Sequence, residues 1–223
     1  MIDTNLLRTT PYFTGLSDGD IAAVSARVFL KKADRGELLS FEGERAEAVF
    51  TVVSGVVKTY KTSADGKEQI FRIVRPGSTF NDAPVLGDSL NLVTVEAMSA
   101  VELYGVKQAD MASLIAEYPV IARNAITVLS RRVQELVTLV EDFSFLHVTG
   151  RVAKMLLTHL QPDAAAGHPR LTQQEMAALI GTAREMVGRS LKNLEEEGII
   201  RMERNRIVIA DEAALRKMAG VAG

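Results

Sequence analysis

The chain has 223 residues, 47% of them hydrophobic, and a formal net charge of −2, so it is long enough for one large domain or two smaller ones. It contains no cysteine, which excludes disulfides and iron–sulfur clusters held by thiolates. No run reaches the roughly 18 apolar residues of a membrane span, and Asp3 and Arg8 interrupt any signal-peptide pattern. We therefore expect a cytoplasmic protein with no membrane partner.

The first half of the chain predicts a short helix followed by many short strands. Ser17 is a candidate N-cap ahead of an apolar-periodic run that ends near Val28. Between residues 30 and 106, glycines recur at about the spacing of turns, and Asp65-Gly66 is a hairpin signal. The β-rich runs are residues 48–53, 56–60, 69–74, 93–97 and 101–106. This pattern indicates an antiparallel barrel or double-sheet jelly roll, whose interior is either a ligand cavity or simply a packed core.

Residues 109–147 are predicted to be helical, with Pro119 near the start of the main helix. Apolar residues alternate there at spacings of four and three. They are Ala122, Ile126, Leu129, Val133, Leu136, Val140 and Phe143. The strict alternation favours a parallel homodimer seam, although a helix buried within one large domain would give a similar stripe.

The last third of the chain predicts a helix-turn-helix. A helix over 151–160 and a loop over 161–169 precede two capping-box patterns, Thr172-x-x-Glu175 and Thr182-x-x-Glu185. Gly181 lies between them and allows the chain reversal of a tight turn. The second helix of such a motif can lie in the major groove of DNA.

The predicted second helix has two different sides. Val187, Leu191 and Leu194 repeat at helical spacing and are expected to face a core. The other side carries the candidate base readers Arg184, Glu185, Gly188 and Arg189. Arginine can donate two hydrogen bonds to guanine, and glutamate can accept one from cytosine. Residues 200–209 alternate around a polar turn and predict a two-stranded wing, while an ordinary helical hairpin with a solvated face remains the alternative.

The charge balance differs between the two parts of the chain. Residues 1–149 hold 15 Lys and Arg against 19 Asp and Glu, whereas residues 150–223 hold 11 against 9. Affinity for DNA phosphates must therefore come from a few placed cations rather than from bulk charge. The candidates are Arg170, Lys192, Arg201, Arg204 and Arg206.

These residues carry a family resemblance. The helix-turn-helix resembles that of the CRP/FNR superfamily of bacterial transcription regulators, and the similarity covers nearly the whole chain. Arg184, Glu185, Gly188 and Arg189 match the Arg-Glu-x-x-Gly-Arg pattern of the catabolite-activator branch. The resemblance implies double-stranded DNA with TGTGA-like half-sites and RNA polymerase as partners. By family position it also implies DNA-backbone contacts from Thr172, Gln174, Thr182 and Lys192.

The predicted strands resemble the cyclic-nucleotide-binding-type sensor domain of the same superfamily. The expected fold class is α+β, with an N-terminal antiparallel jelly roll, a long dimerisation helix and a C-terminal winged helix-turn-helix. The expected domains are a sensor over residues 1–118, the dimerisation helix over 119–147, and the DNA-binding domain over 148–223.

The resemblance also locates an effector pocket. Its candidate residues are Phe80, Asn81, Asp82, Asn91 and Leu92. Family members that bind cyclic nucleotides have arginine and Ser or Thr at the positions of Asn91 and Leu92. Without that arginine, a buried phosphate would have no charged partner, at a cost of several kcal/mol, so we do not expect cyclic AMP as the effector.

Other effectors and functions stay open at this stage. The segments Val57-Lys58-x-Tyr60 and Gly66-x-Glu68-x-Ile70 are similar to members that regulate respiration and nitrogen-oxide metabolism, some of which bind haem. Haem therefore remains an alternative to an unknown small molecule, although all three histidines fall outside the predicted barrel.

We expect no metal site at His159, Asp163 and His168 and no enzyme activity. Two rival functions are a cyclic-nucleotide receptor and a small-molecule-binding module without specific DNA binding.

Overall fold

The computed structural model describes residues 2–166, 170–203 and 206–221. Internal contacts divide the chain into two units, residues 1–61 with 71–135 and residues 62–70 with 136–223. The long helix α5 (Pro119–Phe145) contributes to both units, because the division falls after Glu135.

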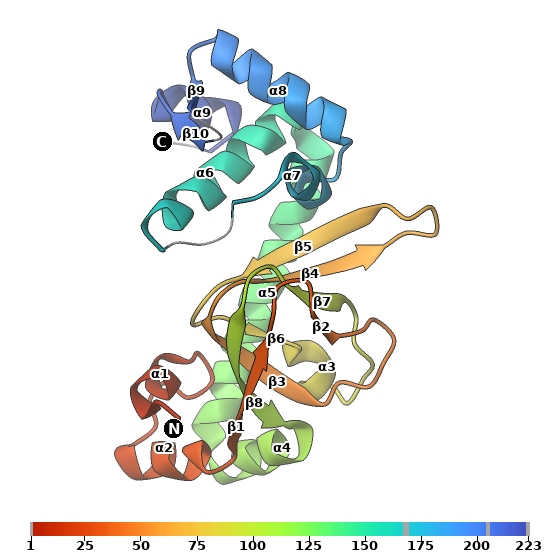
Figure 1. Cartoon of the computed structure of the whole chain (residues 1–223). Coiled ribbons are helices and arrows are strands. Elements are labelled where there is room, and N and C mark those ends of the chain that lie inside the picture. Colours follow the sequence, from red (N-terminus) through yellow and green to blue (C-terminus); the bar gives the residue numbers. More distant parts are fainter. Residues whose placement is uncertain (1, 167–169, 204–205, 222–223) are drawn as a thin grey trace. The chain divides into compact units, whose positions relative to one another are not determined.

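Two four-stranded sheets form the body of the first unit, except that the tip of one hairpin, residues 62–70, belongs to the second unit (Figure 1). One has the order β1-β8-β3-β6 and the other has the order β2-β7-β4-β5. The first comprises β1 (Val28–Ala33), β8 (Val101–Lys107), β3 (Ala48–Ser54) and β6 (Thr79–Phe80). The second comprises β2 (Leu38–Ser40), β7 (Thr94–Ala97), β4 (Val57–Thr62) and β5 (Glu68–Val74). The predicted β-roll is confirmed, and each predicted β-rich run lies largely in a strand.

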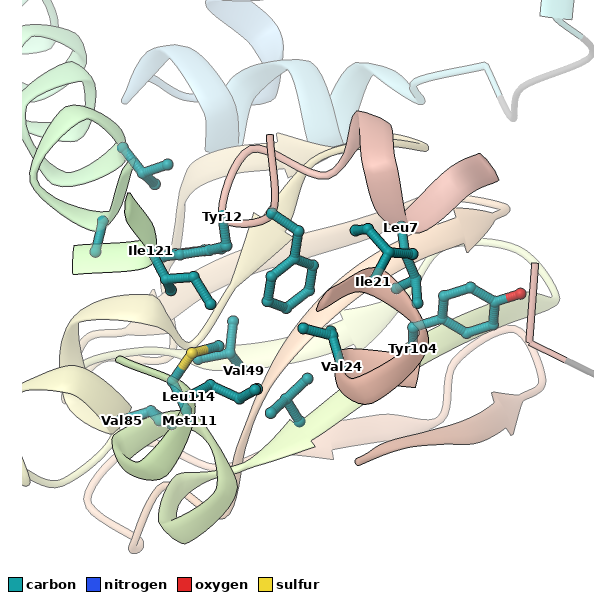
Figure 2. Close-up of a cluster of buried hydrophobic side chains, with 14 of the residues drawn as sticks. Leu7, Tyr12, Ile21, Val24, Val49, Val85, Tyr104, Met111, Leu114 and Ile121 are labelled. Carbon is teal, nitrogen blue, oxygen red and sulfur yellow. The ribbon is translucent and has the colours of Figure 1, made fainter. Parts of the chain in front are cut away.

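The alternation of side chains along β3 separates two hydrophobic cores. Ala48, Phe50 and Val52 face the core that the two sheets share. Val49 belongs to a second core beneath the helices. Those helices are α1 (Thr4–Thr9), α2 (Asp18–Ser25), α4 (Gln108–Glu117) and the start of α5. Figure 2 shows side chains from all four helices meeting strands β3 and β8 in this second core.

Helix α5 has apolar residues on two of its faces. Ile121, Ala125 and Val128 are buried in the helix-covered core of the first unit. The predicted 4-3 stripe lies on the other side. Its exposed members are Ile126 at 67%, Val133 at 60%, Leu136 at 52%, Val140 at 63% and Phe143 at 40% of full accessibility. Ala122 and Leu129 are half-buried. The helix is therefore not enclosed by its own chain, as far as the described residues show.

The second unit contains the predicted winged helix-turn-helix. Its elements are the end of α5, α6 (Val148–Ala166), α7 (Gln173–Ile180), α8 (Arg184–Glu196), β9 (Ile200–Glu203), β10 (Arg206–Ile209) and α9 (Glu212–Met218). The wing strands pair antiparallel, from Arg206 opposite Glu203 to Ile209 opposite Ile200. The predicted loop over 161–169 is wrong up to Ala166, because α6 continues through a run of alanines, which are strong helix formers. His168 lies outside the described residues.

The helices that the structure describes include none with the length and apolarity needed to cross a bilayer.

Candidate DNA interface and polar cluster of the β-roll

The turn of the helix-turn-helix depends on Thr172 and Gly181. Helix α7 begins with the predicted capping box, in which Glu175 N–H donates to Thr172 Oγ1 at 3.1 Å and Thr172 N–H donates to Glu175 Oε2 at 2.6 Å. It ends at Gly181, whose φ of 66° is the left-handed conformation that disfavours other residues. A Cβ at this position would also lie 2.8 Å from the Phe143 ring. Only glycine fits this turn without a shift of its surroundings.

The second predicted capping box is not formed. Helix α8 has Ala183 as its N-cap and no capping side chain. Because the helix begins one residue later than predicted, Glu185 is at its second position rather than its third and cannot close the box with Thr182. The Thr182 N–H instead donates to Ala177 O at 3.0 Å, as part of the turn. The Glu185 carboxylate is therefore free for another role.

Helix α8 has the two predicted sides. Val187, Leu191 and Leu194 are buried in the core of the second unit. Arg184, Glu185 and Arg189 are exposed, and Gly188 is half-buried. Within the described residues, none of the three charged side chains is engaged in an ion pair or side-chain hydrogen bond. The first two turns of α8 thus present an unpaired guanidinium–carboxylate–guanidinium set to solvent.

The candidate backbone-contacting residues have different surroundings. Thr172 and Gln174 are exposed at the start of α7, although the Thr172 hydroxyl already caps that helix. Thr182 is half-buried. Lys192 is exposed and lies 3.5 Å from Glu196, an exposed pair that a phosphate can readily displace. On the wing, Arg201 and Arg206 are exposed, whereas Arg204 lies outside the described residues.

Three side-chain hydrogen bonds in the second unit were not predicted from the sequence. Arg151 Nε donates to Ile180 O at 3.0 Å, and Arg151 Nη1 donates to Leu146 O at 2.8 Å. The Arg151 guanidinium thus links the end of α7 to the segment between α5 and α6. Ser190, on the buried side of α8, lies 3.1 Å from Thr149 of α6, hydroxyl to hydroxyl. These contacts fix the orientation of the recognition helix on its support.

The five candidate effector-pocket residues differ in burial and in their contacts. Phe80 is buried and its ring stacks on Phe50, 5.2 Å between centroids. Asn81 has the left-handed φ of 60° and precedes helix α3 (Asp82–Leu86). Asn91 is buried, with its backbone bonded to Gly43 and Glu44, whereas the Leu92 side chain is 59% exposed. Asp82 belongs to a different set of contacts.

Asp82 lies in a polar cluster drawn from five segments of the first unit. Its side chain is 5% exposed, and its Oδ2 lies 3.8 Å from Arg132 Nε of α5. The pKa of this carboxyl group is also influenced by Arg72 of β5, Thr79 of β6 and Tyr12 of the N-terminal segment. Burial raises the pKa of Asp82, and the nearby Arg132 and Arg72 only partly oppose that shift. Sequence reasoning missed Arg72 and Arg132.

Comparisons with known proteins agree with both units. Residues 30–118 match the family model of the cyclic nucleotide-binding domain, and residues 150–218 match that of the Crp-like helix-turn-helix domain. The chain is 32% identical over 173 residues to the cAMP-activated global transcriptional regulator CRP of Pasteurella multocida, covering 75% of this chain and 83% of that protein. It is 27% identical over 213 residues to the cyclic AMP receptor protein of Thermus thermophilus, covering 96% and 98%.

A solved structure supports the same fold. FixK2 from Bradyrhizobium japonicum superposes with a TM-score of 0.78 at 23% identity, covering 88% of this chain and 99% of that one.

The raised pKa of Asp82 predicts the effect of Asp82→Asn on stability. An aspartate whose folded-state pKa is raised above its unfolded value of 3.8 destabilises the fold as the pH rises through that interval. We expect the neutral variant to melt at a higher temperature than the parent at pH 7, with the difference shrinking as the pH falls toward 3.8. Thermal unfolding across this pH range measures the effect. A variant that is less stable at pH 7 would show that the attraction to Arg132 outweighs the cost of burial.

Proposed function

Because the chain belongs to the CRP/FNR superfamily of transcription regulators, we propose that it acts as a homodimer that reads a specific DNA sequence under the control of an effector in the β-roll. The observation that carries the DNA-reading part is the solvent-facing set of Arg184, Glu185 and Arg189 on the first two turns of α8, which has no ion-pair partner among the described residues. Charged side chains that are exposed at the N-terminal end of a recognition helix can form hydrogen bonds with the edges of DNA bases.

We propose a half-site of the TGTGA type. The arginine forks of Arg184 and Arg189 suit the O6 and N7 acceptors of guanine. The Glu185 carboxylate, which caps no helix, suits a cytosine amino group on the complementary strand. Gly188 keeps the surface between these readers low, so that the helix can approach the groove closely.

We propose that the exposed stripe of α5 is the homodimer seam. Two copies packed along this stripe would remove its apolar side chains from water, where each contributes on the order of 25 cal/mol per Å² buried. A two-fold axis would then relate two recognition helices, which would read a pseudo-palindrome with half-sites about 34–36 Å apart. RNA polymerase and a cytoplasmic setting complete the proposal, on the strength of the family alone.

We propose an effector other than cyclic AMP, with haem as the alternative to an unidentified small molecule. The support is the buried amide of Asn91 and the exposed Leu92 at the positions where cyclic-nucleotide receptors of the family have arginine and a hydroxyl. Titration calorimetry with cyclic AMP and cyclic GMP tests this proposal. Saturable heat at micromolar concentrations of either nucleotide would contradict it.

Arg189→Ala tests base reading. Loss of one bidentate contact should weaken binding to a palindromic TGTGA duplex by about 1–3 kcal/mol and relax the preference at one guanine. Binding to random duplex should change much less. Fluorescence anisotropy with both duplexes measures the difference. Arg216→Ala is the control, because this exposed arginine of α9 is paired with Glu212 instead. Equal weakening on both duplexes would refute the reading role, and a parent protein without preference would favour the module without specific DNA binding.

Val140→Asp tests the dimer seam. The side chain is 63% exposed in one chain, so the substitution should leave the fold of each unit intact. Two carboxylates facing each other in an apolar seam should instead dissociate the dimer and abolish tight binding to the palindrome. Sedimentation equilibrium gives the oligomeric state. Thr138→Asp, on the same helix but outside the stripe, is the matched control. A Val140→Asp protein that stays dimeric would place the interface elsewhere.

A further inference from the structure

The first turn of α8 carries a large apolar side chain beside its charged residues. Met186 is 37% exposed, although it lies between the exposed Glu185 and the buried Val187. The core of the second unit takes Val187, Leu191 and Leu194 from this helix, and Met186 lies outside that core. Packing of the second unit therefore does not require a methionine at this position.

Met186 lies on the same side of α8 as Glu185 and Arg189. Each residue of an α-helix turns the side-chain direction by about 100°, so Glu185 lies between Arg184 and Met186 around the axis. Arg189, nearly one turn further on, lies only about 60° around the axis from Met186 and about 4.5 Å along it. Glu185, Met186 and Arg189 are all exposed. One solvent-facing surface therefore contains a carboxylate, a thioether and a guanidinium group.

The charged members of this surface recognise bases through hydrogen bonds, which leaves one feature of the major groove without a reader. Thymine presents its 5-methyl group there, and apolar side chains are the groups that contact it. In a TGTGA-type half-site, each guanine has a thymine in a neighbouring base pair. Methionine suits the methyl group because its unbranched thioether is flexible and polarisable and adapts to irregular apolar surfaces.

We infer that Met186 is a further specificity-determining residue, whose thioether packs against the 5-methyl group of a thymine beside the guanine that Arg189 reads. The inference rests on the proposed function, because it requires α8 to lie in the major groove. Binding removes both the exposed methionine side chain and the thymine methyl group from water. Loss of one buried methyl group of this kind corresponds to about a fourfold loss of affinity.

Replacement of thymine by uracil removes this methyl group and leaves the hydrogen-bonding edges of the base pair in place. Fluorescence anisotropy with the full-length protein compares a palindromic TGTGA duplex with duplexes that carry uracil at one thymine position of both half-sites. At one of these positions, uracil should weaken binding of the parent protein by about fourfold for each half-site. That position should adjoin the guanine whose preference Arg189→Ala relaxes.

Met186→Gln keeps the length and helix propensity of the side chain but replaces the thioether by an amide. This variant should bind the thymine and uracil duplexes equally well, whereas Met186→Leu, which stays apolar, should retain part of the difference. Met202→Gln is the matched control, because Met202 of the wing strand β9 is also exposed, at 44%. It should leave the effect of uracil unchanged. Equal binding of all these proteins to random duplex shows that they are folded, since that binding depends on phosphate contacts.

Two results would overturn the role of Met186. In the first, uracil weakens binding of the parent at none of the thymine positions. In the second, Met186→Gln keeps the full effect of uracil, or Met202→Gln removes as much of it. Failure of the proposed function looks different, because the parent would then bind the palindrome no better than random duplex, and the inference would fail with it. Specific binding that is indifferent to uracil would contradict the role of Met186 alone.

Discussion

Helix α5 has two apolar faces, and the described residues of its own chain bury only one of them. Ile121, Ala125 and Val128 close the helix-covered core of the first unit, whereas the stripe that contains Val133 and Val140 is left in water. An amphipathic helix of this length is stabilised mainly by packing rather than by intrinsic propensity. In the proposed homodimer, a second copy of the same helix covers the second face with matching spacing.

The charged residues of α5 connect the same helix to the polar cluster around Asp82. Arg132 and Glu135 extend from the helix into the polar cluster of Asp82, Arg72 and Thr79. One helix thus carries both the apolar stripe and one of the two arginines that lie near Asp82. A ligand can shift the helix only by binding its two arrangements with different affinity.

Local signals in the sequence predicted the elements, but not how distant residues meet. The capping box at Thr172, the turn at Gly181 and the buried side of α8 follow from spacing alone, and all three are confirmed. The second capping box was wrong because the turn uses the Thr182 N–H and the helix begins later. The cluster around Asp82 joins residues as far apart in the sequence as Tyr12 and Arg132. The residues next to an arginine in the sequence do not show whether its side chain will be buried beside a carboxylate or exposed to solvent.

Selection from a pool of random DNA duplexes, with the full-length protein at two salt concentrations, tests the central claim most directly. The account predicts a pseudo-palindrome whose halves resemble TGTGA, with lower affinity at the higher salt because phosphate contacts release counterions. Recovery of no common sequence at either salt concentration would contradict the account.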